Sequence, residues 1–103
     1  MVSYLRMKIG PSQRAIIEHL NKVSYKADDF PPWSATQPGI AEALEMSRPR
    51  VSGIMSRCVR NGHIAHCGLS RIRMPDGRQT WPHRLRYYRL TEEGMRLLEE
   101  ADG

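Results

Sequence analysis

Four stretches of the chain carry apolar residues at helical spacing, and each follows a residue that favours a helix start. The first predicted helix spans about residues 12–23, with Ser12 as its N-cap. The second helix is predicted to follow a Thr36 cap, the third a Ser47 cap and the fourth a Thr91 cap. Four helices are therefore predicted, with only a short turn between the second and the third.

The third predicted helix has the most complete pattern. Five apolar residues at positions i, i+3, i+4, i+7 and i+8 form a stripe that is expected to face the core: Val51, Ile54, Met55, Cys58 and Val59. Pro49 lies in the first turn, where a missing N–H costs nothing. Asn61 and Gly62 predict that the helix ends there with a residue in the left-handed backbone conformation. The other side of this helix, rich in arginine, serine and glycine, is expected to face solvent.

The segments between the helices give weaker signals. Residues 24–35 contain aspartates and adjacent prolines and predict a long connection that is too polar for the core.

A β-hairpin is predicted after the third helix. Its arms, residues 63–74 and 78–90, flank the turn signal Pro75-Asp76-Gly77, and Pro82 implies a bulge or an edge position. Because successive side chains of a strand point to opposite faces, Tyr88 is expected to face the core. Three residues of the last helix are expected to face the core: Met95, Leu98 and Ala101. Leu97 is expected to lie off this inward stripe.

Positive charge is concentrated in one part of this single-domain chain. Residues 47–90 hold ten arginines, no lysine and one acid, Asp76, for a net charge of +9. The rest of the chain has a net charge of −4, so that the whole carries +5. A field polarised in this way attracts a polyanion such as a nucleic acid.

Other classes of protein find little support. There is no stretch of 18 apolar residues, which predicts a cytoplasmic protein without a membrane partner. The sequence has no phosphate-binding loop, paired catalytic carboxylates or nucleophile elbow, so we expect neither an enzyme nor a cofactor. Strand geometry spreads four candidate metal ligands too far apart for one ion: His63, His66, Cys67 and His83. Cys58 is expected to fill the core, whereas the role of Cys67 stays open.

Two segments carry a family resemblance: TQPGIAEALEMSRPRVSGIMSRCVRNGHI and YYRLTEEGMRLLEE resemble MarR-type and related archaeal transcription regulators. The resemblance covers about residues 12–101. It implies an α+β winged helix-turn-helix fold, with a three-helix core, a long β-hairpin wing and a C-terminal helix. It also implies sequence-specific binding of double-stranded DNA, with the third helix in the major groove and the wing on the adjacent backbone or minor groove.

The predicted DNA-binding residues combine the positions that the resemblance implies with others on the outer face of the third helix and on the hairpin. They are Ser47, Arg48, Pro49, Arg50, Ser52, Gly53, Ser56, Arg57, Arg73 and Arg78. Gly53 stands where related proteins often project a long polar side chain to a base edge. Here that contact is either missing or replaced by a close approach of the backbone. Glu45 stands in the turn before the third helix, where the motifs of related proteins often place glycine because the backbone approaches a left-handed conformation. A glutamate there is expected to cost about 1 kcal/mol.

We expect residues 12–103 to form the winged domain. Residues 1–11 are expected to contribute to a homodimer, because Tyr4, Leu5, Met7 and Ile9 are apolar without an obvious place in a small core. The last helix is the second expected dimer surface, because Leu97 lies off its inward stripe. Family members usually act as dimers, although their long dimerisation helices are absent or abbreviated here. The sequence does not indicate a small-molecule effector. The alternative function is a winged-helix module that binds another protein.

Overall fold

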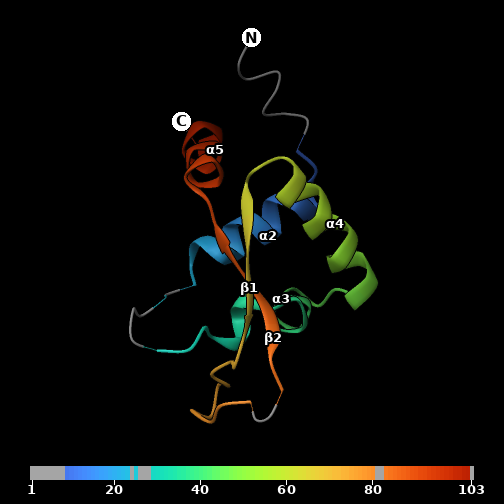
Figure 1. Ribbon diagram of the computed structural model, residues 1–103. Helices are drawn as coiled ribbons and strands as arrows, with labels where there is room; N and C mark the ends of the chain where they lie inside the picture. Colours follow the sequence, from blue (N-terminus) through green and yellow to red (C-terminus); the bar gives the residue numbers. More distant parts are fainter. Residues whose placement is uncertain (1–8, 24, 26–28, 81–82, 103) are drawn as a thin grey trace.

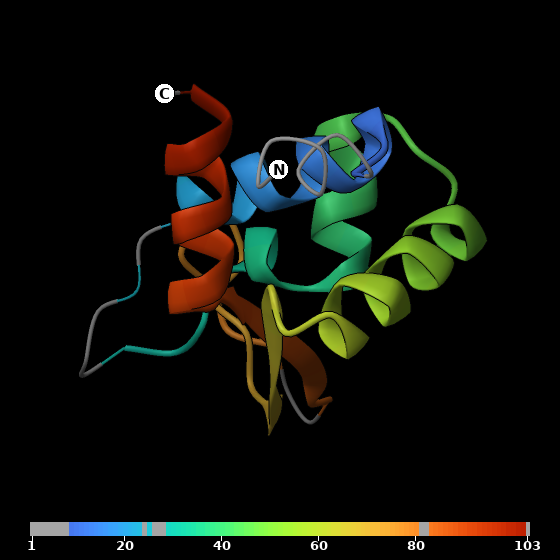
Figure 2. The same ribbon diagram turned by 90° about the horizontal axis from the view of Figure 1, so that it is seen from above.

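The computed structural model describes residues 9–23, 25, 29–80 and 83–102, without the side chains of residues 101 and 102. The elements, in chain order, are α2 (Pro11–Asn21), the 3-10 helix η1 (Trp33–Ala35), α3 (Gln37–Leu44), α4 (Arg48–Arg60), β1 (Ile64–Ser70), β2 (Leu85–Leu90) and α5 (Glu92–Asp102). The antiparallel hairpin of β1 and β2 points away from α5 (Figure 1). From above, α4 and α5 lie on opposite sides of α2 and α3 (Figure 2).

One apolar core joins the helices to the base of the hairpin. The helices α2, α3 and α4 each contribute apolar side chains, and the hairpin and α5 close the core: Ile16, Ile17, Leu20, Ile40, Ala41, Val51, Met55, Cys58, Ile64, Tyr88 and Leu98. The assignments of Cys58 and Tyr88 to the core are confirmed. The prediction for Val59 was wrong, because this side chain lies at the edge of the α4 stripe and is 36% exposed.

Side-chain caps fix the starts of α3 and α4. Thr36 Oγ1 accepts a hydrogen bond from the Gly39 N–H at 3.1 Å, and Ser47 Oγ accepts one from the Arg50 N–H at 3.3 Å, as predicted. Between these helices Glu45 has φ 53° and ψ 45°, the left-handed conformation that was expected. A tight turn therefore sets the direction of α4.

The start of the first helix differs from the prediction. α2 begins at Pro11, and its N-cap is Gly10, which makes no side-chain capping bond. Proline at the first helical position is already set for a helical φ, so the helix does not need a serine cap. Ser12 lies inside the first turn, and the helix ends at Asn21 rather than near Val23.

Part of the connection before α3 is buried, contrary to the prediction. Ala35, the last residue of this connection, is 0% exposed, and so is the Thr36 cap that follows it. Gly39 allows this packing, because a Cβ there would lie 1.9 Å from the carbonyl oxygen of Trp33. The connection also contacts the hairpin, since the Arg73 N–H donates to Pro31 O at 2.8 Å and the Trp33 N–H donates to Arg73 O at 2.9 Å.

The paired part of the hairpin is shorter than predicted. Regular pairing joins Ile64–Ser70 to Leu85–Leu90 and is interrupted by a bulge between His66 and Gly68, where Gly68 has φ 116°. The bulge predicted at Pro82 lies outside the described residues. Residues 71–80 are irregular, because Arg73 pairs with the connection before α3 as well as with the second arm. The predicted turn is present, with Gly77 at φ 90°.

The inward face of α5 is rotated from the prediction. Met95 is 43% exposed, whereas Leu97 is partly buried against the core; both predictions were wrong. Gly94 explains the rotation, because a Cβ there would lie 2.3 Å from the carbonyl oxygen of His63. The close-packed face therefore runs through Gly94, Leu97 and Leu98. The side chain of Ala101 lies outside the described part of the chain.

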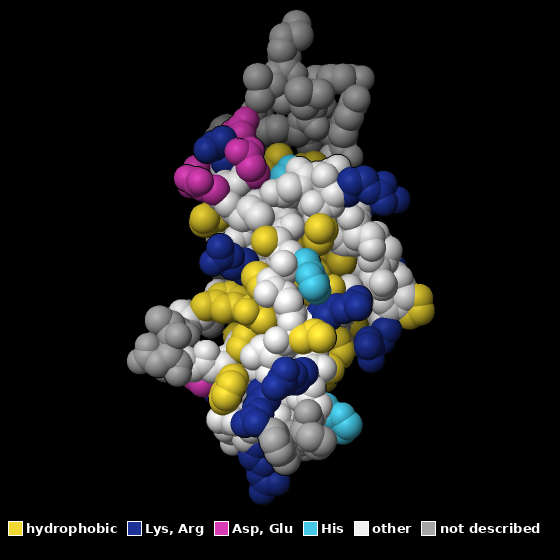
Figure 3. All heavy atoms as spheres, in the orientation of Figure 1, with side chains coloured by type: hydrophobic (Ala, Val, Ile, Leu, Met, Phe, Trp, Pro, Cys, Tyr) yellow, Lys and Arg dark blue, Asp and Glu magenta, His cyan; other side chains and the backbone are white. Residues whose placement is uncertain are grey.

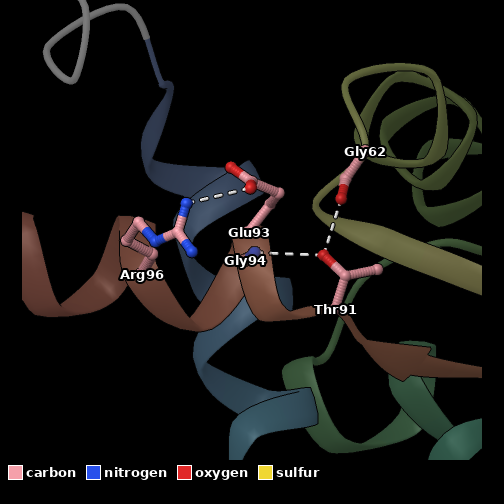
Figure 4. A network of polar contacts seen from close by, with 5 residues as sticks. All are labelled: Gly62, Thr91, Glu93, Gly94 and Arg96. Atoms are coloured by element: carbon pink, nitrogen blue, oxygen red, sulfur yellow. Dashed lines mark hydrogen bonds and ion pairs between the residues drawn. The ribbon is translucent and has the colours of Figure 1, made fainter.

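Thr91 joins α5 to the end of α4, as Figure 4 shows. Its hydroxyl donates to Gly62 O at 2.6 Å and accepts from the Gly94 N–H at 3.0 Å, which confirms the predicted cap. We expect Thr91→Ala to lower the free energy of unfolding by about 1 to 2 kcal/mol, since both bonds are lost. Thr91→Ser keeps the hydroxyl and should recover most of this loss in urea unfolding. Equal losses in the two variants would contradict the capping role.

Candidate nucleic-acid interface

The outer face of α4 is exposed on the side of the helix that points away from the core. Every predicted DNA-binding residue on this helix and its N-cap is exposed: Ser47, Arg48, Pro49, Arg50, Ser52, Gly53, Ser56 and Arg57. The middle of the face is formed by small residues, and arginines occupy its flanks and its C-terminal end. The structure thus brings most of the predicted site together on one side of one helix.

A groove of about 370 Å³ separates α4 from the hairpin. Arg48 and Ser52 line it from α4, and Arg84 and Arg86 line it from the second arm of the hairpin. Figure 3 shows dark blue side chains over α4 and over the lower part of the hairpin. Basic side chains from two separate elements therefore face one groove.

Arg84 and Arg86 were not among the predicted site residues. The signal that could have found them is the alternation of Arg84, Arg86 and Tyr88, since every second residue of a strand faces the same side. Tyr88 lines the same groove as the two arginines. The expected burial of Tyr88 could therefore have indicated that Arg84 and Arg86 point towards α4.

Contacts with Tyr88 hold the hairpin against the helices. Gln37 Nε2 donates to the Tyr88 hydroxyl at 3.1 Å, and the rings of His66 and Tyr88 meet edge to face with centroids 5.2 Å apart. A second hollow of about 260 Å³ lies beside these residues and is also lined by Met55 and Val59. The position of the hairpin arginines relative to α4 is therefore set by packed and hydrogen-bonded side chains.

The remaining predicted arginines have different surroundings. Arg50 Nη2 donates to Ser12 Oγ at 2.7 Å, which holds this side chain on the α2 side of α4. Arg78 lies at the hairpin turn with its side chain 88% exposed, and its Nε is 3.8 Å from Asp76 Oδ2. Arg73 Nε instead lies 2.9 Å from Asp29 Oδ2, in a half-buried ion pair. The structure does not bring Arg73 into the groove.

Acidic residues gather away from this surface. Figure 3 shows magenta side chains over α5, at the end of the molecule opposite the hairpin. The helix contributes Glu92, Glu93, Glu99 and Glu100, and Arg96 Nη1 is 3.0 Å from Glu93 Oε1. The charge asymmetry of the sequence is therefore a spatial asymmetry as well. A polyanion is attracted to the α4 and hairpin side and repelled from α5.

The thiols and histidines do not form a reactive centre. Burial raises the pKa of Cys58, and burial also raises the pKa of Cys67 more than the nearby Arg89 lowers it. Both thiols are thus kept protonated at neutral pH, and a protonated thiol is a poor nucleophile. Over the part of the chain that the structure describes, no three His, Cys, Asp or Glu side chains are placed to hold a metal ion.

No family model and no curated protein matches the chain. Among solved structures, it is similar to the crystal structure of a MarR family transcription regulator, with a TM-score of 0.62 and 28% sequence identity over 95% of this chain. The chain is a MarR-like winged-helix domain. In this winged-helix domain, α3 and α4 form the helix-turn-helix and the hairpin forms the wing, which confirms the predicted fold.

The winged-helix domain spans about half of the regulator that it matches, 54% of that chain. Within the ranges that the structure describes, none of its helices combines the length and the hydrophobicity needed to cross a bilayer.

Proposed function

We propose that this winged-helix domain is a sequence-specific transcription regulator that binds double-stranded DNA. The observation that carries the proposal is the groove between α4 and the wing, which Arg48 lines from α4 and which Arg84 and Arg86 line from the wing. Guanidinium groups on the two walls of a groove suit a phosphate backbone that passes between them. The likeness to a MarR family transcription regulator supports the same function.

In this proposal α4 enters the major groove, which is about 12 Å wide and admits a helix. Arg50 and Arg57 contact base edges or phosphates from one flank of the helix. Arg48 and the wing arginines contact the adjacent backbone, and Arg78 at the wing tip reaches the backbone or the minor groove. Arg73 is left out of the contact set, because it does not line the groove and its side chain pairs with Asp29.

We further propose that the protein binds DNA as a homodimer. One recognition helix reads only a few base pairs, so a single small domain discriminates poorly against competing genomic sites. The expected contribution of residues 1–11 falls almost entirely outside the described residues. Among the described side chains of α5, the exposed large apolar one is Met95, and not Leu97 as expected from the sequence. Met95 is therefore the candidate contact of this helix.

Selection of bound duplexes from a random pool tests the specificity and the dimer together. We expect the enriched duplexes to share a short motif that occurs twice in inverted orientation, with half-sites about 10 base pairs apart or a multiple of this spacing. A pool that binds without enrichment would contradict sequence-specific recognition. Enrichment of one motif without symmetry would contradict the homodimer but not DNA binding.

A further inference from the structure

Gly53 lies in the interior of α4 on its exposed face. Nothing lies within 4 Å of the position that a Cβ would occupy there, and the backbone is not in the left-handed region. Glycine in the interior of a helix is less favourable than alanine, because it loses more backbone freedom on folding. The fold therefore gives no reason for glycine at this position.

Two other helical glycines show the contrast. A Cβ at Gly39 would lie 1.9 Å from the Trp33 carbonyl oxygen, and a Cβ at Gly94 would lie 2.3 Å from the His63 carbonyl oxygen. Close packing inside the domain requires glycine at both positions. At Gly53 the corresponding space lies outside the protein.

The surroundings of Gly53 indicate what could occupy that space. Residues three and four positions away are its neighbours on the helix surface, and these include Arg50 and Arg57 on one flank. On the other flank, Arg48 lines the groove shared with the wing. Cationic side chains thus stand on both sides of a stretch of helix that has no side chain at its centre.

We propose that Gly53 is a specificity-determining residue, at which the backbone of α4 contacts the base edges of the major groove directly. This inference rests on the DNA-binding function proposed above. The missing Cβ lets the helix axis come closer to the bases while the flanking arginines reach the phosphates on either side. At that depth the hydroxyls of Ser52 and Ser56, which suit several base edges, are brought within reach of the bases.

The test uses the full chain with Gly53→Ala and Gly53→Leu. Affinity is measured by fluorescence anisotropy for two duplexes of equal length, namely the sequence selected by the wild-type protein and a random sequence. We expect Gly53→Ala to raise Tm by about 4 °C, because alanine is the better helix former. Its affinity for the selected duplex should fall about tenfold, and that of Gly53→Leu further, whereas random-duplex affinity changes less than about twofold.

Ala43→Leu serves as the matched control, because Ala43 is exposed on α3 and does not line the groove between α4 and the wing. It should leave both affinities unchanged. Unaltered affinity of Gly53→Ala for the selected duplex would overturn the inference, and so would an equal loss on both duplexes. Failure of the proposed function itself would be seen separately, as weak binding of both duplexes by the wild-type protein at low salt.

Discussion

Replacing Arg48, Arg84 and Arg86 together with alanine is expected to lower the affinity for any duplex by about 100-fold at about 0.15 M salt. Each arginine that neutralises a phosphate releases condensed counterions, which contribute a log–log salt slope of about −0.9 per phosphate. Loss of three contacts should therefore make the slope less negative by about 2 to 3. Anisotropy titrations at several salt concentrations measure both quantities.

A matched variant separates the groove from net charge. Lys22, Arg89 and Arg96 are exposed and do not line the groove between α4 and the wing. Their joint replacement with alanine removes the same charge and should cause a much smaller loss of affinity. Equal losses in the two triple variants would mean that overall charge, and not the groove, governs binding. Because all three groove arginines are exposed, their replacement should leave Tm nearly unchanged.

Gly39→Ala is expected to lower the free energy of unfolding by about 2 to 3 kcal/mol, although alanine is the better helix former. The added Cβ would lie 1.9 Å from the oxygen and 2.6 Å from the carbon of the Trp33 carbonyl group. Both are backbone atoms, so η1 must move away from α3. The movement would disturb the Thr36 cap and the pairing of Trp33 with Arg73.

Urea unfolding measures this loss, and Gly53→Ala is the control. Gly53→Ala also replaces a helical glycine with alanine, but nothing lies within 4 Å of its new Cβ. This variant should therefore stabilise the domain. Stabilisation by Gly39→Ala would contradict the close packing of η1 on α3.

The elements that could be predicted from the sequence are those whose determinants are local. Thr36, Ser47 and Thr91 were identified as caps because the capping hydroxyl and its N–H partner are three residues apart. The core face of α4 followed from helical spacing alone, except at Val59 on its edge. The left-handed turn residue Glu45 was identified from the family resemblance, because related motifs often place glycine there.

The features that the sequence did not predict depend on contacts between distant residues. Leu97 faces the core and Met95 is exposed, the reverse of the prediction, because Gly94 packs against the carbonyl group of His63. Arg73 lies outside the groove and pairs with Asp29, which is far away in sequence. Arg84 and Arg86 line one groove with Arg48 because the hairpin packs on α3 and α4 through Tyr88.

Salt dependence of binding to a random duplex tests the central claim most directly. The wild-type chain is titrated with a labelled duplex at several salt concentrations between about 0.05 and 0.2 M. If four to six arginines neutralise phosphates, the log–log slope should be about −4 to −5. A flat salt response, or no binding at the lowest salt concentration, would contradict DNA binding and favour the alternative of a protein-binding winged helix.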